Sequence, residues 1–305
     1  MKQTVLITGG TGTIGHRLTQ LLQQEGYTVT WLSRTGQSTP NVRVFHWDVP
    51  KGHLDPQAIL TADHVIHLAG AGIADGRWTD ERKKEIIDSR TRSTDLLAEA
   101  LQSGNHHVQS FVASSAIGYY GGDTGDRPMV ETSPAGSDFL AQVTRLWERS
   151  VDQVAALGIR TVKLRTGVVL TMEGGALPKL VQPIRLNAGA ALGSGQQYIS
   201  WIHVDDLCRM YLDALRDERW QGVYNAVAPM PVTNAALTRQ IAQVLGKVLI
   251  LPNVPAFALR LAFGELAVTV LGSSLVINKR VQDETDFQYQ FADLRVALQH
   301  LLKAT

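Results

Sequence analysis

The 305-residue sequence has a single cysteine, Cys208. One cysteine excludes a disulfide within the chain and a zinc site built from several thiolates, and it favours a reducing compartment. Cys208 lies in an apolar helical stretch, so we interpret it as a small core residue rather than a nucleophile. The histidines lack zinc-ligand spacing, and we therefore predict no metal site.

The sequence also lacks an excess of either charge, because 29 lysines and arginines balance 28 acidic residues. This balance gives no indication that the protein binds nucleic acid or an anionic membrane surface. The most apolar stretch, residues 254–271, is interrupted by Arg260, Gly264 and Glu265, so we interpret it as a buried or interface helix rather than a membrane span. We expect no signal peptide and a cytoplasmic protein that acts on a small molecule; a homodimer is allowed.

Short apolar runs alternate with amphipathic helical runs along much of the chain. Apolar positions at helical spacing predict a helix from Ile14 to Gly26. A polar helix is predicted at 80–102, and further helices at 139–157 and after His203. Between them, apolar runs predict strands at 4–8, 28–32, 42–47, 64–68, 110–114, 161–170 and 222–227. Strands separated by helices pair in parallel through right-handed crossovers. The sequence therefore predicts a Rossmann-type, doubly wound α/β sheet.

Two further segments differ from this pattern. Residues 172–198 are rich in glycine and proline, and the chain from Pro229 onward is helical apart from a short apolar run at 249–251. They predict a smaller, mostly helical C-terminal substrate lobe over the carboxyl edge of the sheet. The predicted division is a nucleotide-binding domain of residues 1–170 and 201–230, and a lobe of residues 171–200 and 231–305. We expect the ligand cleft between them, beside Ser115.

The most informative motif is Thr8-Gly9-Gly10-Thr11-Gly12-Thr13-Ile14-Gly15, which lies between an apolar strand and an amphipathic helix. Glycines allow a tight turn and close backbone approach, and a pyrophosphate can then bind the free N–H groups at the helix N-terminus. We predict that these eight residues bind a dinucleotide. The alternative is a tight strand–helix turn without a ligand.

The end of the second strand distinguishes NAD from NADP. An NAD site usually has an acidic residue there, whereas this chain has Ser33-Arg34-Thr35. An arginine can bind a 2′-phosphate through two hydrogen bonds. We therefore predict that Ser33 and Arg34 favour NADP(H) over NAD(H), the alternative being that Arg34 is exposed loop charge.

Two more strand ends fit a cofactor site. Asp48 ends the third strand, where a carboxylate can accept from the adenine amino group, although a turn-forming aspartate is an alternative. Leu68, Ala69 and Gly70 end the fourth strand, where small residues let the backbone approach the adenosine ribose.

These residues carry a family resemblance. The chain is similar to the extended short-chain dehydrogenases/reductases, which include nucleotide-sugar epimerases and dehydratases. More narrowly, Ser115-Ala116-Ile117-Gly118-Tyr119-Tyr120-Gly121 and the tail from Leu251 resemble an atypical bacterial epimerase family subgroup. The other matching residues are the 8–15 motif, Asp48-Val49, His67-Leu68-Ala69-Gly70, Ser114-Ser115-Ala116, Glu131, Pro134, Arg165-Thr166-Gly167-Val168 and Trp201-Ile202-His203-Val204-Asp205-Asp206.

The family's catalytic pair is absent. The resemblance implies a serine, matched by Ser115, and a Tyr-x-x-x-Lys pair in which the lysine lowers the tyrosine pKa. Phe139 and Val143 occupy those two positions, and Tyr-x-x-x-Lys occurs nowhere in the chain. Neither replacement can transfer a proton, so the family's usual mechanism is not expected here.

Tyr119 and Tyr120 are the alternative proton donors, because they follow Ser115 in a glycine-flanked loop at a strand's carboxyl end. The competing interpretation for each is aromatic packing. Two functions stay open: an NADP(H)-dependent oxidoreductase or epimerase-like enzyme, and a non-catalytic NADP(H) sensor.

The resemblance also implies the remaining ligand contacts. Arg165 is assigned to the cofactor site, and Lys179, Arg185, Gln197 and Tyr198 are predicted substrate contacts in segments that line the family's substrate pocket. Apart from the resemblance, Trp78 in the loop 75–78 is predicted to cover the nicotinamide end beside the substrate. Each of these has a packing or surface role as its alternative. For His203, beside Asp205 and Asp206, we favour a structural histidine with an N-cap carboxylate over a metal site or a catalytic dyad.

Overall fold

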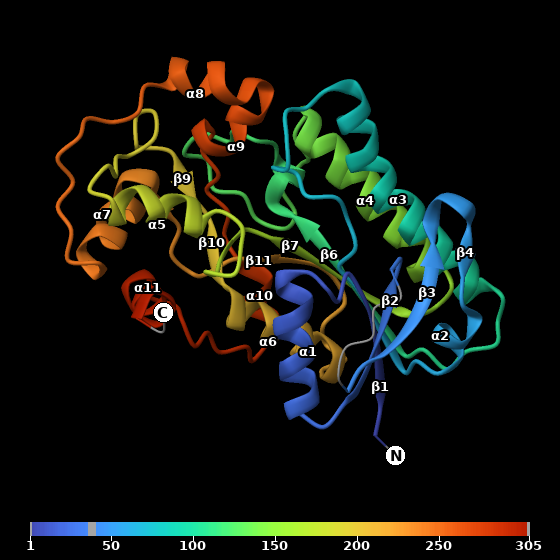
Figure 1. The fold of residues 1–305 in the computed structure, drawn as a ribbon. Helices are drawn as coiled ribbons and strands as arrows, with labels where there is room; N and C mark the ends of the chain where they lie inside the picture. The colour runs from blue at the N-terminus through green and yellow to red at the C-terminus, as the bar shows by residue number, and fades with distance from the viewer. Residues whose placement is uncertain (1, 36–40, 304–305) are drawn as a thin grey trace.

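The centre of the protein is a twisted sheet, seen in a computed structural model that describes residues 2–35 and 41–303 (Figure 1). Eight strands of the described residues follow the order β11-β7-β6-β5-β1-β2-β3-β4, and all neighbours are parallel except β3 and β4. The strands are β1 (Thr4–Thr8), β2 (Thr28–Ser33), β3 (Arg43–Asp48), β4 (His53–Leu54), β5 (His64–His67), β6 (Ser110–Ala116), β7 (Arg160–Thr166) and β11 (Gly222–Ala226). The predicted α/β class is confirmed.

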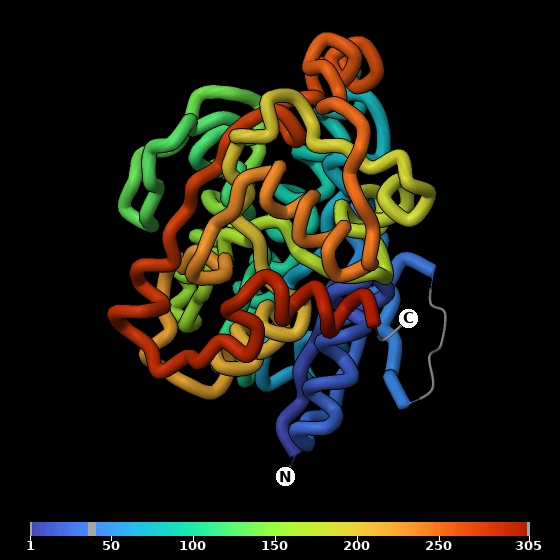
Figure 2. The backbone as a smooth tube through the Cα atoms, turned by 90° about the vertical axis from the view of Figure 1, so that its left-hand side faces the viewer, coloured from blue at the N-terminus to red at the C-terminus, as the bar shows by residue number. Residues whose placement is uncertain are grey.

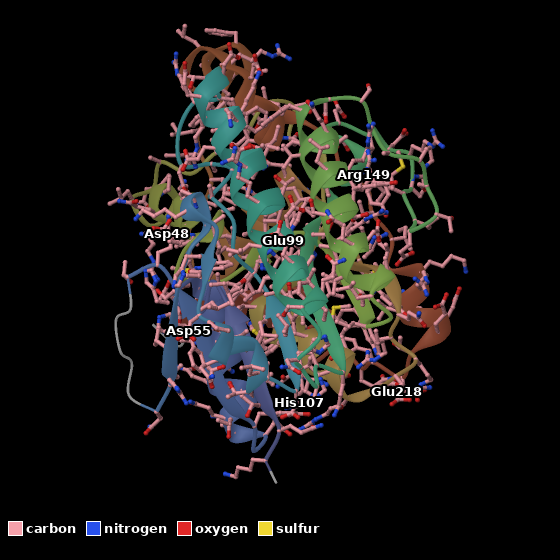
Figure 3. The ribbon with its side chains drawn as sticks, turned by 90° about the vertical axis from the view of Figure 1, so that its right-hand side faces the viewer. Asp48, Asp55, Glu99, His107, Arg149 and Glu218 are labelled. Carbon is pink, nitrogen blue, oxygen red and sulfur yellow. The ribbon has the colours of Figure 1, made fainter. Side chains whose placement is uncertain are left out.

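Helices cover both faces of the sheet because its strands are apolar on both faces. Val5 and Ile7 of β1 pack into the core under α1 (Thr13–Gln24) and α6 (Val204–Arg216), whereas Leu6 faces the opposite core. That second core lies under α2 (Pro56–Leu60), α3 (Asp80–Gln102) and α4 (Phe139–Ala156), and Figure 3 shows α3 and α4 side by side. Each fully buried aliphatic side chain contributes about 1.5–3 kcal/mol.

The order in which the chain adds strands to the sheet reverses between β1 and β5. The chain runs outward from β1 through β2 and β3, and then returns to build β5, β6, β7 and β11 on the other side. In open α/β sheets, ligands bind in the crevice outside the carboxyl ends of the strands at this switch point. The topology therefore points to the ends of β1, β2 and β5.

A third core joins the helical C-terminal region. It includes Leu177, Val181, Leu237, Ile241 and Leu298. The elements of this part are β8 (Val168–Leu170), α5 (Leu177–Arg185), β9 (Tyr198–Ile199), β10 (Trp201–His203), β12 (Val232–Thr233), α7 (Asn234–Val244), α8 (Ala256–Phe263), η3 (Gly264–Ala267), α9 (Val268–Leu271), α10 (Lys279–Glu284) and α11 (Leu294–Lys303). In Figure 2 the red C-terminal segment descends along one edge of the molecule before it reaches α11. The residue-level division into two domains stays a prediction.

The predicted strand at 161–170 is wrong as a single strand. It divides at Gly167 into β7 and β8, and β8 leaves the main sheet to pair with β10. A Cβ atom on Gly167 would lie 2.4 Å from the Ser200 carbonyl oxygen, so the break depends on a close approach of two backbone segments. No periodicity in the sequence reveals such a contact.

The predicted helix at 254–271 is also divided. Gly264 has φ +60° and separates α8 from the short helices η3 and α9. Most of α8 is exposed in the single chain, with Phe257 73% and Leu261 78% accessible, so of the two predicted settings the buried helix is wrong and the interface helix stays a prediction. Within residues 2–35 and 41–303, no helix is both long enough and apolar enough to cross a membrane.

Candidate functional site

The glycine-rich turn ends β1 and leaves the start of α1 without a cap. Gly9 has φ +71°, and a Cβ atom on Gly15 would lie 2.4 Å from the Gly9 carbonyl oxygen, so both positions require glycine. The N-cap of α1 is Gly12, which has no side chain to accept from the first turn, and that turn contains no acidic residue. By contrast, Asp138 caps α4. The N–H groups of α1 are therefore free to bind an anion.

A cavity of about 770 Å³ opens beside this turn. It lies at the ends of β1, β2, β3 and β5 and along α3, where the topology places a ligand. Eight of the predicted cofactor residues line it: Gly9, Thr11, Gly12, Ser33, Arg34, Leu68, Ala69 and Gly70. Arg34 is exposed and forms no ion pair with any described residue. The volume is in the range of small-molecule sites.

Asp48 has a local role in the structure. Its carboxylate accepts from the Lys51 backbone N–H at 3.3 Å and pairs with the Lys51 ammonium at 2.8 Å, so it caps the 3₁₀ turn η1 (Val49–Lys51). Its neighbours Trp47 and Val49 line the cavity, but Asp48 does not. The adenine contact proposed for Asp48 stays a prediction.

Thr8 ties the glycine-rich turn to the end of β5. Its Oγ1 accepts from the N–H groups of Leu68 and Ala69, both at 3.1 Å, so the hydroxyl donates to His67 Nδ1 at 2.7 Å. His67 Nε2–H then donates to Thr94 Oγ1 at 3.1 Å. Burial, and to a smaller extent the charge of Arg90, lowers the pKa of His67 to about 3. A neutral His67 therefore holds the two strand ends that frame the cavity.

The buried histidines predict a loss of stability in acid. Burial lowers the pKa from the ordinary 6.5 to about 3 for His67 and to about 4 for His203. Below pH 6.5 these two histidines are protonated in the unfolded chain but remain neutral in the folded chain. The free energy of unfolding therefore decreases as the pH is lowered, by up to about 1.4 kcal/mol per pH unit for each histidine. Urea titrations between pH 7 and pH 5 measure this dependence, and in His67→Gln the free energy of unfolding should decrease less per pH unit, by about this amount. The exposed His107→Gln is the control, and an unchanged slope in His67→Gln would contradict the assignment.

A second cluster lies at the carboxyl ends of β6 and β7. Ser115 donates to Glu148 Oε1 at 2.6 Å, and Arg165 binds both oxygens of Glu148 at 2.8 Å. Arg165 Nη1 also donates to the Tyr120 hydroxyl at 3.0 Å, and the ring of Tyr119 lies 3.4 Å from the guanidinium carbon. The structure thus brings Ser115, Tyr119, Tyr120 and Arg165 together.

The cluster also contains two residues that the sequence reasoning missed. Glu148 lies on α4 and Asn225 on β11, and both are buried. An acidic residue beside Trp147, on the apolar side of an amphipathic helix, was a signal that could have identified Glu148. Asn225 accepts from Tyr120 across 105 positions of sequence, which no local pattern reveals.

The three hydroxyl groups of this cluster differ in availability. Tyr120 donates to Asn225 Oδ1 at 2.7 Å and is buried, and burial raises its pKa. Ser115 is 3% exposed, has its proton committed to Glu148 and lines neither cavity described here. Tyr119 is half-buried, and its hydroxyl forms no hydrogen bond with a described residue. Tyr119 is therefore the free phenol.

An apolar cluster occupies the positions of the missing catalytic pair. The Trp78 ring meets Phe139 edge-on at 4.9 Å, and its Nε1 donates to the Ile73 carbonyl at 2.9 Å. Val143 is buried in the same cluster with Leu266 of η3. Phe139 and Val143 therefore join the helix α4 to the C-terminal region by packing, and Trp78 belongs to that packing.

The other predicted substrate residues differ in their exposure and in their hydrogen bonds. Lys179 and Arg185 lie exposed on α5 without an ion pair to any described residue. Tyr198 is half-buried in β9. The amide of Gln197 is already paired, since Nε2 donates to the Leu192 and Val270 carbonyls and Oε1 accepts from Ser194. None of these contacts tests a substrate role, which stays a prediction.

His203 caps α6 with its own side chain, which corrects the expected carboxylate cap. His203 Nδ1 accepts from the Asp205 backbone N–H at 3.0 Å, while Asp206 accepts from the backbone of residues 290 and 291. Ligand-type atoms of His203, Asp205 and His300 lie within 4.8 Å of one another. They already have partners, because Asp205 pairs with Arg17 and the two imidazoles meet at 3.1 Å.

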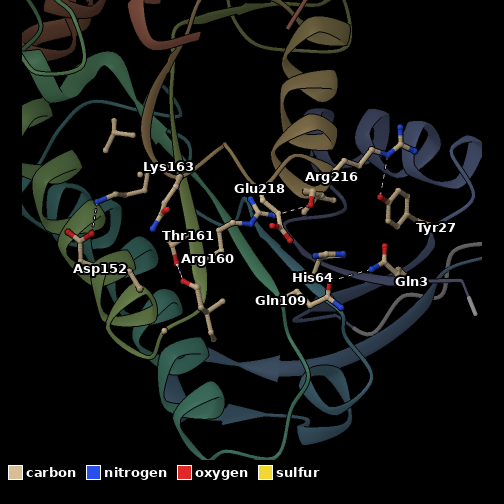
Figure 4. Close-up of a pocket in the computed structure, with 17 residues that line it drawn as sticks. Gln3, Tyr27, His64, Gln109, Asp152, Arg160, Thr161, Lys163, Arg216 and Glu218 are labelled. Carbon is tan, nitrogen blue, oxygen red and sulfur yellow. Dashed lines mark hydrogen bonds and ion pairs between the residues drawn. The ribbon is translucent and has the colours of Figure 1, made fainter. Parts of the chain in front are cut away.

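A second cavity of about 810 Å³ lies at the opposite, amino-terminal edge of the sheet (Figure 4). Its charged groups have structural partners. Lys163 pairs with Asp152 at 2.6 Å, and Arg160 donates to the carbonyls of Ala214, Leu215 and Trp220. This edge lies away from the glycine-rich turn and the switch point. We therefore place the functional site at the carboxyl edge.

Comparison with known proteins is consistent with this geometry. The model of the NAD dependent epimerase/dehydratase family matches residues 5–226, and a domain of unknown function (DUF1731) matches residues 254–301. Epimerase family protein SSP1921 of Staphylococcus saprophyticus is 36% identical over 304 residues, which cover 97% of this chain and 98% of that protein.

Two solved structures are also similar. The crystal structure of human epimerase family protein SDR39U1 (isoform 2) with NADPH has a TM-score of 0.87 and 32% identity, covering 99% of this chain and 100% of that chain. The nucleoside-diphosphate sugar epimerase of Corynebacterium glutamicum has a TM-score of 0.81 and 32% identity, covering 99% of this chain and 58% of that one.

Proposed function

Because the chain belongs to the NAD dependent epimerase/dehydratase family, we propose that it is an NADP(H)-dependent oxidoreductase or epimerase-like enzyme. Its substrate would be a small compound with a hydroxyl or carbonyl group, with nucleotide sugars as candidates. The observation that carries the proposal is the uncapped start of α1, which opens on a cavity whose wall includes Arg34, a cation without an ion pair to any described residue. The NADPH in the structure of the human relative supports the same cofactor.

The residues around the cavity fit the parts of such a cofactor. The N–H groups at the start of α1 would hold the pyrophosphate, and Ser33 with Arg34 would hold the 2′-phosphate. Because β5 lies on the opposite side of β1 from β2, the backbone of residues 68–70 would face the ribose on the nicotinamide side, in place of the adenosine ribose suggested from the sequence. When bound, the nicotinamide supplies hydride transfer, and the protein supplies orientation and the proton path.

The proton path would begin at Tyr119. Its hydroxyl is free, whereas Tyr120 is held between Arg165 and Asn225. The Ser115 hydroxyl donates its one hydrogen bond to Glu148, so its oxygen can only accept further hydrogen bonds. Ser115 is also buried and lines neither cavity, so it would hold Glu148 and Arg165 in place rather than meet the substrate.

A non-catalytic NADP(H) sensor is the second candidate function. The apolar packing of Phe139 and Val143 against Trp78 and Leu266 favours it, because this packing links α4 to the C-terminal region at the two positions where the family has its proton-transfer pair. A panel of carbonyl compounds and nucleotide sugars distinguishes the two candidates. NADPH binding without turnover of any member would favour the sensor.

Removal of Arg34 should reduce NADPH affinity selectively. A charge-assisted contact with the 2′-phosphate contributes about 1.5–3 kcal/mol, so Arg34→Ala should weaken NADPH about tenfold or more and leave NADH unchanged. Calorimetric titration of both cofactors measures this difference. The exposed Arg149 on α4 (Figure 3) gives the matched control Arg149→Ala. Equal affinities of the parent protein for NADPH and NADH would contradict the role of Arg34.

A further inference from the structure

Arg90 on α3 is a buried cation without a counter-ion. It is 8% exposed, and its one hydrogen bond to a described residue runs from Nη1 to the Ile86 carbonyl at 2.9 Å. Its guanidinium lies 5.1 Å from the centre of the Trp147 ring. Burial, and then the neighbouring Arg82, lowers its pKa to about 10, and no carboxylate among the described residues pairs with it. A buried charge without a partner is costly and therefore rare.

The free N–H groups of Arg90 are not sealed inside the core. The described buried side-chain atoms without a partner include Arg82 Nε but no atom of Arg90, so its unpaired nitrogens reach open space. Gly70 lines the carboxyl-edge cavity, and a Cβ atom on Gly70 would lie 3.2 Å from Arg90 Cζ. The absence of a side chain at Gly70 thus leaves room for the guanidinium directly behind the cavity wall, which Ser89 and Ser93 of α3 line and Arg90 does not.

Arg90 of α3 also packs against the face of α4 on which the family's catalytic pair is missing. Trp147, on which it stacks, is one helical turn beyond Val143 and two turns beyond Phe139, so the three share a face. Ile86, which accepts from Arg90, packs in the same cluster as Val143. A cation supplied by α3 therefore lies one helical turn along α4 from the position at which the family's lysine is missing.

The order of the strands indicates which part of a dinucleotide Arg90 would meet. Arg34 follows β2, the glycine-rich turn follows β1, and Gly70 follows β5, and these strands are consecutive neighbours. A dinucleotide with its 2′-phosphate at Arg34 and its pyrophosphate on the turn continues across the edge to β5. The next group along the molecule is the ribose on the nicotinamide side.

We propose that Arg90 binds the hydroxyl oxygens of the nicotinamide-side ribose and supplies there the cation that Val143 cannot. The inference rests on the proposed NADP(H) binding. A guanidinium donates through several N–H groups in fixed directions, and ribose oxygens would complete the pairing that the free protein lacks. The protein tolerates an uncompensated buried charge, and the bound cofactor relieves it.

The test compares Arg90→Met with the exposed-site control Arg149→Met, using two probes. NADPH carries both nucleosides, whereas adenosine 2′,5′-bisphosphate carries only the half that faces Arg34. By calorimetry, Arg90→Met should bind NADPH at least tenfold more weakly and bind the bisphosphate as the parent does. Without ligand, its melting temperature should equal or exceed that of the parent, because a desolvated charge has been removed. Arg90→Lys, which keeps the charge with fewer donors, should be intermediate for NADPH.

Two results would overturn the inference alone. They are unchanged NADPH affinity in both Arg90 variants, and an equal loss for both probes, which would indicate a structural role. A parent protein that binds neither probe would instead refute the proposed function and this inference with it.

Discussion

Gly15→Ala should reduce NADPH affinity by about a hundredfold, equivalent to ~2.7 kcal/mol. The added methyl group would lie 2.4 Å from the Gly9 carbonyl oxygen and 2.7 Å from the Gly10 Cα atom. Both are backbone atoms of the turn, so the clash cannot be relieved by a side-chain rotation and the start of α1 must move. Overpacking of this kind costs about 1–3 kcal/mol, and here it also displaces the N–H groups that would hold the pyrophosphate.

Fluorescence titration with NADPH measures this effect, and Gly76→Ala is the control. A Cβ atom on Gly76 meets nothing within 4 Å, and its φ lies outside the left-handed region. Gly76→Ala should therefore bind NADPH as the parent does. Parent-like affinity in Gly15→Ala, with the fold intact by circular dichroism, would show that the cofactor does not bind at this turn.

The parts of the fold that the sequence predicts are those with local causes. The alternation of Val5, Leu6 and Ile7 between two cores follows from the two-residue period of a strand. The glycine-rich turn can be predicted from the sequence because the backbone atoms that exclude a side chain at Gly15 belong to residues within six positions of it. By contrast, the break at Gly167 depends on Ser200, and the exposure of α8 depends on which surfaces its neighbours leave uncovered.

In the candidate site, too, the features with local causes could be predicted and those that depend on distant elements could not. Ser115, Tyr119 and Tyr120 could be selected because they follow one strand within a recognisable motif. Which hydroxyl is free could not be predicted, since Glu148 and Asn225 come from other elements and decide it. Arg90 was missed because an arginine on a polar helix ordinarily faces solvent, and only the packing of α3 on α4 buries it.

Tyr119→Phe should lower turnover 10²–10⁴-fold on any substrate that the parent converts, while leaving stability and NADPH affinity unchanged. Loss of a general acid or base typically has an effect of this size. The ring and its contact with Arg165 are retained in the variant, and the hydroxyl forms no hydrogen bond that would be lost within the described residues. The measurement is steady-state turnover of the first converted member of the substrate panel, beside thermal unfolding and cofactor titration.

Tyr120→Phe is the matched control, with the opposite expected profile. Removal of its hydroxyl leaves Asn225 Oδ1 without its donor and Arg165 Nη1 without one acceptor, both in a buried cluster. This should cost about 1–3 kcal/mol of stability, and turnover of the folded fraction should fall less than in Tyr119→Phe. If Tyr119→Phe turns over like the parent while Tyr120→Phe is inactive although folded, the assignment of the two phenols is reversed. If both variants turn over like the parent, the proton comes from neither tyrosine, because a buried donor that transfers a proton cannot be replaced by phenylalanine without a loss of rate.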